Sequence, residues 1–312
     1  MARFDLQGHR GARGLKPENT LPSFEAAFDV GVTTVETDIH LTSDGMPVLF
    51  HDAVVSERVC RLLPKTTGVD PFTRPLIRSL TLAQLRAYRA DINADPARFP
   101  TQDAGVTPLV AAFAQEHEMD PFAIPTLADL FAFVIAYSGR LGRLAEKTDE
   151  QRDRVLDIRF DLELKRVPFH PETIGDQFNG DSPALLEQRV IEEVRKAKVI
   201  DRCQVRSFDH RSVRAARKLE PSLSASVLIA ETAPVTPARL ARRADAQTYC
   251  PDYHFLDQQL VRICHEKGIR VVPWTVNEPH EWEQLLAWGV DGITTDYPDR
   301  LAAVLRKRKM AF

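Results

Sequence analysis

Carboxylates and histidines gather near the start of the chain, on both sides of a glycine-containing turn. Glu36 and Asp38 share one face of a predicted strand, because residues two apart in a strand point the same way. The pair Asp44-Gly45 predicts a two-residue hairpin turn, since both central residues of a type I′ turn need a positive φ. This register sets His51 directly opposite Asp38, with Cβ atoms about 5 Å apart, close enough to share a proton, a water or a metal ion.

The same register predicts that the hairpin has one apolar and one polar face. The apolar face consists of Ile39, Leu41, Val48 and Phe50. On the polar face, Leu49 is the one apolar side chain among carboxylates and histidines. Such a polar face is typical of an active-site wall, or of a sheet edge that is simply exposed to water. The elements around the hairpin have to decide between these interpretations.

Polar residues of complementary chemistry stand at the ends of other predicted strands. His9 and Arg10 follow the first strand. The third strand ends with Glu163 and Lys165, and the seventh ends near Trp274. The carboxyl ends of the strands in a parallel barrel meet at one face, so we expect these side chains to converge with the polar face of the hairpin.

Three of these residues are carboxylates that arrive from two adjacent strands. Glu36, Asp38 and Glu163 would repel one another in a half-buried site unless a cation compensated their charges. Ligation by oxygen alone suits one hard divalent cation, Mg²⁺ or Ca²⁺, better than Zn²⁺. Arg10 and Lys165 would face the same place, and together with the metal they would bind a phosphate group.

His9 and His51 complete this set as a general acid and base pair. Imidazole titrates near neutral pH, so one histidine can accept a proton while the other donates one. The other histidines are interpreted as structural or exposed residues: His40, His117, His170, His210, His254, His265 and His280.

Alternating strand and helix patterns fill most of the chain, which is typical of βαβ units in a parallel sheet. Eight strands are predicted, at residues 7–9, 35–38, 161–165, 204–208, 225–230, 246–250, 271–276 and 292–296. Eight such units predict an α/β fold of the TIM (β/α)8 barrel class, with the β-hairpin on strand 2. An open doubly wound sheet is the alternative, although no dinucleotide fingerprint follows the first strand.

Capping signals mark the first two helices. Asn19 or Thr20 precedes the first helix, and Gly31 ends it. Thr126 precedes the second, which is apolar enough to be buried.

Residues 1–312 are predicted to form a single barrel domain, in which residues 53–125 are an insertion subdomain between strand 2 and helix 2. The insertion is rich in Pro and Arg and contains one helical pattern, at residues 81–90. A loop of this length inside a compact domain is usually functional or forms a subdomain. We therefore interpret it as a lid or a specificity wall.

Composition describes an ordinary globular protein that is 44% hydrophobic and 27% charged. The 41 basic and 44 acidic residues leave a formal charge of −3, which argues against nucleic acid or an anionic membrane surface as a partner. The four cysteines are scattered, so neither a zinc site nor a disulfide scaffold is expected. No apolar run suits an integral membrane segment and no signal segment opens the chain, so we expect a cytoplasmic protein, or a periplasmic or secreted one if the native N-terminus was trimmed.

The chain resembles the glycerophosphodiester phosphodiesterase family, which has the phospholipase C-like TIM barrel. The resemblance rests on GHRGARGLKPENTLPSFEAAFDVG, VETDIHLTSDGMPVLFHD, LELK, RSFD, VVPWTVN and GITTDYP. It implies a barrel with a family-specific insertion after the hairpin, and metal-dependent hydrolysis of a small-molecule glycerophosphodiester to sn-glycerol 3-phosphate and an alcohol. It assigns catalysis to His9 and His51, metal ligation to Glu36, Asp38 and Glu163, and substrate contacts to Arg10, Lys165 and Trp274.

Two details and two competing functions stay open at this point. The nucleophile is a water or the glycerol hydroxyl of the substrate, and either histidine can be the acid. A related lysophospholipase D-like barrel would need an apolar rim, for which the candidates are Phe113, Phe122, Phe131 and Phe133. A catalytically silent barrel that binds a phosphorylated ligand would have lost part of the site, whereas both histidines and all three carboxylates are present.

Overall fold

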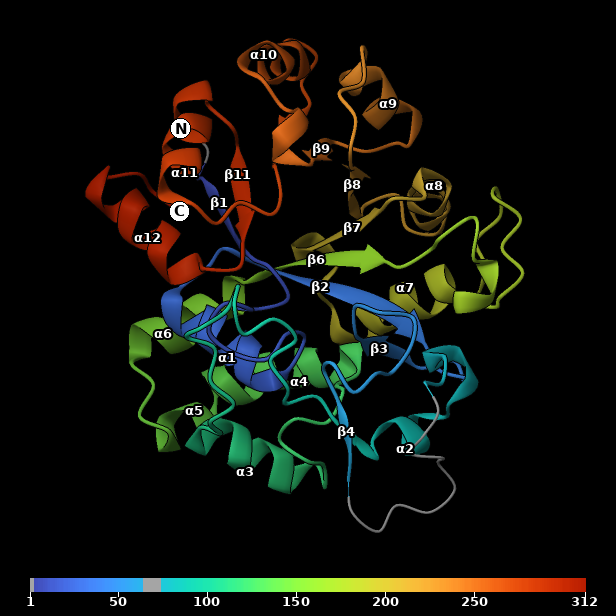
Figure 1. Ribbon diagram of the computed structural model, residues 1–312, viewed down its shortest axis with the longest axis vertical. Coiled ribbons are helices and arrows are strands. Elements are labelled where there is room, and N and C mark those ends of the chain that lie inside the picture. The colour runs from blue at the N-terminus through green and yellow to red at the C-terminus, as the bar shows by residue number, and fades with distance from the viewer. Residues whose placement is uncertain (1–2, 64–73) are drawn as a thin grey trace.

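Eight parallel strands form a barrel in the computed structural model, which describes residues 3–63 and 74–312 (Figure 1). In chain order the strands are β1 (Asp5–Gly8), β2 (Thr34–Leu41), β6 (Arg159–Leu164), β7 (Cys203–Ser207), β8 (Ser224–Ile229), β9 (Thr248–Pro251), β10 (Arg270–Val271) and β11 (Gly292–Thr295). Around the ring they follow the order β10-β9-β8-β7-β6-β2-β1-β11. The predicted TIM barrel and its eight strands are confirmed.

Backbone hydrogen bonds close the ring between β10 and β11, the two ends of this order. The amide of Asp291 donates to the carbonyl oxygen of Val271 at 2.9 Å, and that of Thr294 donates to Pro273 at 3.0 Å. β1 pairs with β11 along its whole length, so the start and the end of the barrel sequence lie side by side. Residues at the carboxyl ends of all eight strands therefore share one face of the barrel.

Helices surround the strands and bury their apolar faces against them (Figure 1). The eight main helices are α1 (Leu21–Val30), α4 (Leu127–Ser138), α7 (Leu185–Ala197), α8 (His210–Leu219), α9 (Pro237–Arg243), α10 (Gln258–Glu266), α11 (Pro279–Trp288) and α12 (Pro298–Lys307). Shorter helices are α5 (Arg140–Leu144) and α6 (Asp149–Arg154), with 3₁₀ turns η2 (Val155–Asp157), η3 (Pro171–Thr173), η4 (Ile200–Arg202) and η5 (Tyr253–Phe255). Every helix among the described residues is too short or too polar to cross a membrane.

Capping follows the sequence signals. The hydroxyl of Thr20 accepts a hydrogen bond from the amide of Ser23, and Gly31 ends α1 with a φ of 85°. Of the two predicted N-caps, Thr20 is therefore correct, and Asn19 is left for another role. Thr126 forms a capping box with Asp129 at the start of α4.

The predicted register of the hairpin is wrong by one residue. β3 (Pro47–Leu49) pairs with β2 so that Ile39 lies opposite Leu49 and Leu41 lies opposite Pro47. The turn contains three residues, because the amide of Gly45 donates to the carbonyl of Thr42 at 3.0 Å. Gly45 has a φ of 76°, the left-handed conformation that such a loop requires after its first bend.

The corrected register exchanges the faces of β3. Leu49, which the predicted register left among polar residues, packs with Ile39 in the main core. Val48 and Phe50 point the other way into a second apolar cluster, and Phe50 rather than His51 faces Asp38, with its amide 3.1 Å from the carbonyl of Asp38. β3 ends at Leu49, and His51 follows in a bend.

The insertion is built on this second cluster, whose buried members are Val48, Phe50, Val55, Cys60, Ile77, Leu80, Leu85, Tyr88, Ala90 and Ile124. Its elements are β4 (Arg61–Leu62), η1 (Ile77–Ser79), α2 (Leu82–Leu85), β5 (Tyr88–Arg89) and α3 (Pro108–Glu116). The helix predicted at residues 81–90 is shortened to α2, because Tyr88 and Arg89 pair with β4 instead. α3, which was not predicted, packs through Phe113 into the main core.

Candidate active site

A pocket of about 290 Å³ opens at the carboxyl ends of the barrel strands. Six of the eight predicted site residues line it: His9, Arg10, His51, Glu163, Lys165 and Trp274. The other two, Glu36 and Asp38, lie close beneath and are 0% and 1% exposed. The fold therefore brings all eight together.

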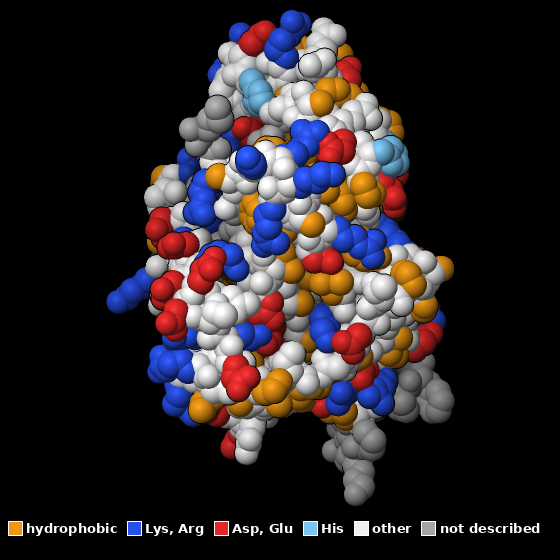
Figure 2. Space-filling view, turned by 90° about the vertical axis from the view of Figure 1, so that its left-hand side faces the viewer, with side chains coloured by type: hydrophobic (Ala, Val, Ile, Leu, Met, Phe, Trp, Pro, Cys, Tyr) orange, Lys and Arg blue, Asp and Glu red, His pale blue; other side chains and the backbone are white. Residues whose placement is uncertain are grey.

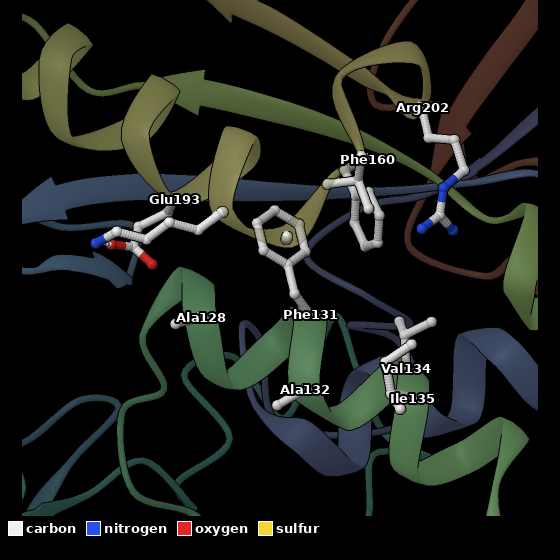
Figure 3. Close-up of a pocket in the computed structure, with 11 residues that line it drawn as sticks. Ala128, Phe131, Ala132, Val134, Ile135, Phe160, Glu193 and Arg202 are labelled. Atoms are coloured by element: carbon white, nitrogen blue, oxygen red, sulfur yellow. Dashed lines mark hydrogen bonds and ion pairs between the residues drawn. The ribbon is translucent and has the colours of Figure 1, made fainter.

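A second cavity, of about 300 Å³, lies between α4 and α7 (Figure 3). Phe131 and Phe160 form its floor, with alanine and aliphatic side chains around them. Of its charged side chains, Lys196 is paired with Glu193 at 2.9 Å, and Arg202 donates to backbone carbonyls. Its lining offers no histidine or carboxylate cluster, so the pocket at the barrel mouth is the candidate active site.

Three buried carboxylates form the base of the pocket. β2 and β6 pair in a register that places Asp38 beside Glu163, and Glu36 lies two residues before Asp38 on the same face. Oxygen atoms of the three carboxylates all lie within 4.8 Å of one another. Burial raises the pKa of Glu36 to about 8, so its negative charge is not fully compensated by the protein.

This cluster fits a divalent cation. Its donors are all carboxylate oxygens, which hard ions such as Mg²⁺ and Ca²⁺ prefer. Oε1 of Glu36 is buried and accepts no hydrogen bond, although a guanidinium nitrogen of Arg206 lies 2.7 Å away. Buried carboxylate oxygens whose charge is incompletely neutralised form the environment that a cation would stabilise.

Arg10 and Lys165 follow β1 and β6, the two strands that flank β2, and approach the carboxylates from its two sides. Nε of Arg10 lies 3.2 Å from Asp38, and its Nη1 donates to Glu18 at 2.7 Å. Nζ of Lys165 lies 2.8 Å from Glu163 and 3.2 Å from Asp38. Burial alone would raise the pKa of Asp38, but Lys165 and Arg10 hold it well below its usual range. Both cations also line the pocket, so they can reach an anionic substrate.

His9 is oriented by a carboxylate that the sequence did not predict. Its Nδ1 lies 2.6 Å from Oδ1 of Asp296, and its Nε2 lies 3.8 Å from Glu36. Burial lowers the pKa of His9 to about 4, although Asp296 opposes that shift. An ionised Asp296 accepts a hydrogen bond from Nδ1–H, so the neutral ring presents Nε2 as an acceptor.

His51 reaches the pocket from the bend after β3. Its Nδ1 lies 2.7 Å from Asp52, and its side chain is 35% exposed, far more than that of His9. The predicted position opposite Asp38 is wrong, but His51 lines the same pocket as His9, Arg10 and Lys165.

Other polar contacts at the site also escaped prediction. Asn19 donates to Oδ2 of Asp38 at 2.9 Å, a role hidden because the residue stands in a helix-capping sequence. Arg206 on β7, 2% exposed, bridges Glu36 and Asp161. Asp296 directly follows β11, so the strand-end signal that identified the other site residues applied to it too.

The insertion also contributes to the site. Nη2 of Arg98 lies 3.2 Å from Oδ2 of Asp296, and its carbonyl accepts a hydrogen bond from the hydroxyl of Tyr297 at 2.8 Å. Phe99 is buried beneath the guanidinium of Arg13, 4.7 Å from its ring centre. Residues 98 and 99 therefore hold the insertion against the loop that carries His9.

Trp274 forms an apolar wall together with Phe208. Its indole nitrogen donates to the carbonyl of Cys250 at 2.8 Å, which fixes the ring. The ring of Phe208 meets it edge to face, with centroids 5.6 Å apart, and is 44% exposed. The pocket thus combines a charged floor with an aromatic side.

Comparison with known proteins gives a consistent result. A model of the "Glycerophosphoryl diester phosphodiesterase family" matches residues 9–300. The sequence is 27% identical to a glycerophosphodiester phosphodiesterase of Caldanaerobacter subterraneus subsp. tengcongensis, over 96% of each chain. It is 25% identical to one of Bacillus altitudinis, over 96% of this chain and 98% of that protein.

Solved structures share the fold over nearly the whole chain. A candidate glycerophosphoryl diester phosphodiesterase from Silicibacter pomeroyi DSS-3 superposes with a TM-score of 0.77 at 25% identity, covering 100% of this chain and 96% of that one. A phosphodiesterase from Oleispira antarctica, solved in complex with the product sn-glycerol-3-phosphate, has a TM-score of 0.68 at 22% identity and 96% coverage of both chains.

Proposed function

The chain belongs to the glycerophosphoryl diester phosphodiesterase family, and from that membership we propose that its barrel-mouth pocket hydrolyses glycerophosphodiesters to sn-glycerol 3-phosphate and an alcohol. The observation that carries the proposal is the meeting of two histidines and two cations above three carboxylates whose oxygens lie within 4.8 Å of one another. These groups together supply proton transfer, anion binding and a cation site, as phosphodiester cleavage requires.

Arg10 and Lys165 would hold the phosphate group of the substrate. Both are anchored to Asp38, at 3.2 Å in each case, so their donors are already oriented before substrate arrives. A side-chain cation fixed in this way stabilises the charge that develops on the phosphoryl oxygens, and the side chain does not have to move during the reaction. Mg²⁺ or Ca²⁺ held by Glu36, Asp38 and Glu163 would add a Lewis acid at the same phosphate.

His9 would act as the general base and His51 as the general acid. Asp296 fixes the proton of His9 on Nδ1, which leaves Nε2 to accept a proton from the nucleophile, a water or the glycerol hydroxyl. His51 is partly exposed in the bend after β3, where it can protonate the departing alkoxide and regain its proton from solvent. Trp274 would pack against the carbon skeleton of the substrate.

The test is release of sn-glycerol 3-phosphate from glycerophosphocholine, glycerophosphoethanolamine and glycerophosphoglycerol, after dialysis against a chelator and after return of Mg²⁺ or Ca²⁺. We expect activity to disappear with chelation and to return with one of the ions. Full activity in the chelated protein would remove the metal from the mechanism, and failure to cleave any of these diesters with either ion would overturn the proposed activity.

Lysophospholipid substrates are not favoured. The four phenylalanines that could have formed an acyl-binding rim, Phe113, Phe122, Phe131 and Phe133, are all buried in the protein. Phe113 and Phe133 pack edge to face with each other in the core. We therefore expect lysophosphatidylcholine to be cleaved more slowly than glycerophosphocholine in the same assay.

A further inference from the structure

A cavity of about 160 Å³ lies at the opposite end of the barrel from the active site. It is bordered by residues that precede or begin strands β1, β2, β6 and β10, so it belongs to the amino-terminal face. Figure 2 shows the side of the molecule on which the chain ends and α6 lie, where Lys and Arg side chains gather over the central and upper part. No catalytic step assigned above uses this face.

Four arginines line the cavity: Arg3, Arg154, Arg159 and Arg270. Two side-chain carboxylates share the lining, Asp5 and Asp157, and the main-chain oxygen of Phe312 accepts a hydrogen bond from Arg3 at 3.1 Å. The site therefore carries an excess of two formal positive charges. Such an excess inside a cavity attracts an anion, because the surrounding protein focuses the field of the charges.

Asp5 is already committed to other partners. Its Oδ1 accepts hydrogen bonds from the hydroxyls of Thr33 and Thr34 at 2.8 and 2.6 Å, and its Oδ2 accepts one from Gln7 at 2.9 Å. The guanidinium of Arg270 approaches it only to 3.9 Å. Asp5 therefore makes only a long ion pair with Arg270 and accepts no hydrogen bond from its guanidinium.

Arg154 and Arg159 have even weaker partners. Within residues 3–63 and 74–312, Arg159 forms no hydrogen bond or ion pair through its side chain, and neither does Asp157. Arg154 has one ion pair, with Glu150 at 3.8 Å, and Glu150 is 86% exposed. Exposed pairs at such distances contribute little.

The backbone is shaped to admit one of these guanidinium groups. Gly31 has a φ of 85°, and a Cβ atom there would lie 2.3 Å from Cζ of Arg154. Arg154 and Arg270 are partly exposed, at 33% and 35%, and contact one carboxylate each. The buried Arg166 and Arg206 differ, because each contacts two carboxylates. The arginines of this cavity lack that internal compensation, so a partner from solution is the natural counter-charge.

We propose that this cavity binds an oxyanion of the phosphate class, as free phosphate or as the phosphate group of a monoester. Guanidinium groups bind tetrahedral oxyanions through paired N–H donors, and Arg154, Arg159 and Arg270 present such donors to one space. The volume of about 160 Å³ admits a phosphate group but leaves a larger ester to extend into solvent. The proposal is independent of the catalytic activity.

Calorimetric titration of the full chain with inorganic phosphate, at constant ionic strength, tests the site. Phosphate is also expected to bind the active site, where its constant is measured separately as competitive inhibition of turnover. Arg159→Gln and Arg154→Gln should each weaken the second binding event about 10- to 100-fold, the usual effect of losing a charged hydrogen bond. Both variants should keep the inhibition constant and the turnover of the wild type. Asp157→Asn should tighten the second event up to about fivefold.

Arg262→Gln, on the exposed face of α10, is the matched control and should change neither constant. Titration with sn-glycerol 3-phosphate and with a bulkier phosphomonoester distinguishes free phosphate from an ester as the preferred form. The proposal fails if the wild type binds one phosphate only, in competition with substrate. It also fails if Arg159→Gln and Arg154→Gln bind as the wild type does, or if Arg262→Gln loses as much affinity as they do.

Discussion

Substitution of Asp296 by Asn tests how the protein sets the proton of His9. Oδ2 of Asp296 accepts hydrogen bonds from Asn277 at 2.8 Å and from Arg98 at 3.2 Å. In Asp296→Asn these two donors should retain the carbonyl oxygen of the new side chain. The amide NH₂ is then turned toward Nδ1 of His9, whose N–H donates a hydrogen bond to Oδ1 of the native carboxylate at 2.6 Å.

A donor at that position reverses the tautomer of His9. Nδ1 must become the acceptor, the ring proton moves to Nε2, and the nitrogen that faces the substrate can no longer take a proton. Loss of a general base typically lowers kcat by about 10²- to 10⁴-fold, equivalent to about 3 to 5 kcal/mol of barrier. KM should change less than about threefold, since Asp296 is not expected to touch the substrate.

The assay is release of sn-glycerol 3-phosphate from glycerophosphocholine, with kcat and KM measured separately at several pH values. Glu25→Gln is the control, because Glu25 is an equally buried carboxylate that pairs with Lys147 at 2.7 Å outside the pocket. It should lose stability but keep kcat. A kcat of Asp296→Asn within about threefold of the wild type would refute the tautomer argument, and so would an equal loss of kcat in Glu25→Gln.

Three further outcomes follow from the structure. His51→Ala should lower kcat by about 10²- to 10⁴-fold while the melting temperature stays near that of the wild type, and near-normal turnover would exclude His51 as the acid. Gly45→Ala should destabilise the chain by about 1 kcal/mol in urea titrations, because φ at Gly45 is 76° and no neighbour obstructs a Cβ; an unchanged midpoint would contradict this. Burial lowers the pKa of His40 to about 4, so between there and the ordinary pKa near 6.5 only the unfolded chain binds the proton. The free energy of unfolding should therefore fall by up to about 3 kcal/mol as pH drops from 7 to 4, and His40→Gln should lack this pH-dependent loss. Denaturant titrations of both proteins at the two pH values measure it, and an equal loss in His40→Gln would contradict the assignment to His40.

The barrel and most of its site were accessible from sequence because both depend on local patterns. Each barrel strand is a short apolar run between a helix and a polar strand end. His9, Glu163 and Lys165 stand at such ends, and parallel strands bring those ends to one face whatever the details of packing. The family motifs carry the same residues, so two independent arguments selected them.

The hairpin shows where local patterns are insufficient. Ser43, Asp44 and Gly45 are compatible with a two-residue or a three-residue loop. Gly45 is left-handed in either case, but Asp44 lacks the positive φ that the two-residue type I′ turn needs, so the three-residue loop forms. That choice moves every side chain of β3 to the opposite face. Leu49, apolar on a face predicted to be polar, was the one sign in the sequence that the register should shift.

The sequence did not reveal which distant residues contact one another at the site, even where a strand-end signal marked the residue itself. Asp296 contacts His9 across 287 residues, and Arg98 reaches Asp296 from an insertion without a regular apolar period. A carboxylate after a strand is equally typical of a helix cap or a turn, so its type alone does not reveal a partner. In the sequence, Arg206 is likewise only a charged residue in a strand, and its position between two carboxylates follows from the assembled barrel.

The contact between His9 and Asp296 has a consequence for the order in which the protein acquires activity during translation. Glu36, Asp38 and Glu163 all leave the ribosome well before β11 and Asp296. Until β11 pairs with β1, a nascent chain can assemble the carboxylates but has no residue to hold the ring of His9. Prematurely terminated products should therefore retain an acidic cluster yet be unable to consume substrate, so that hydrolysis begins only when the barrel has closed.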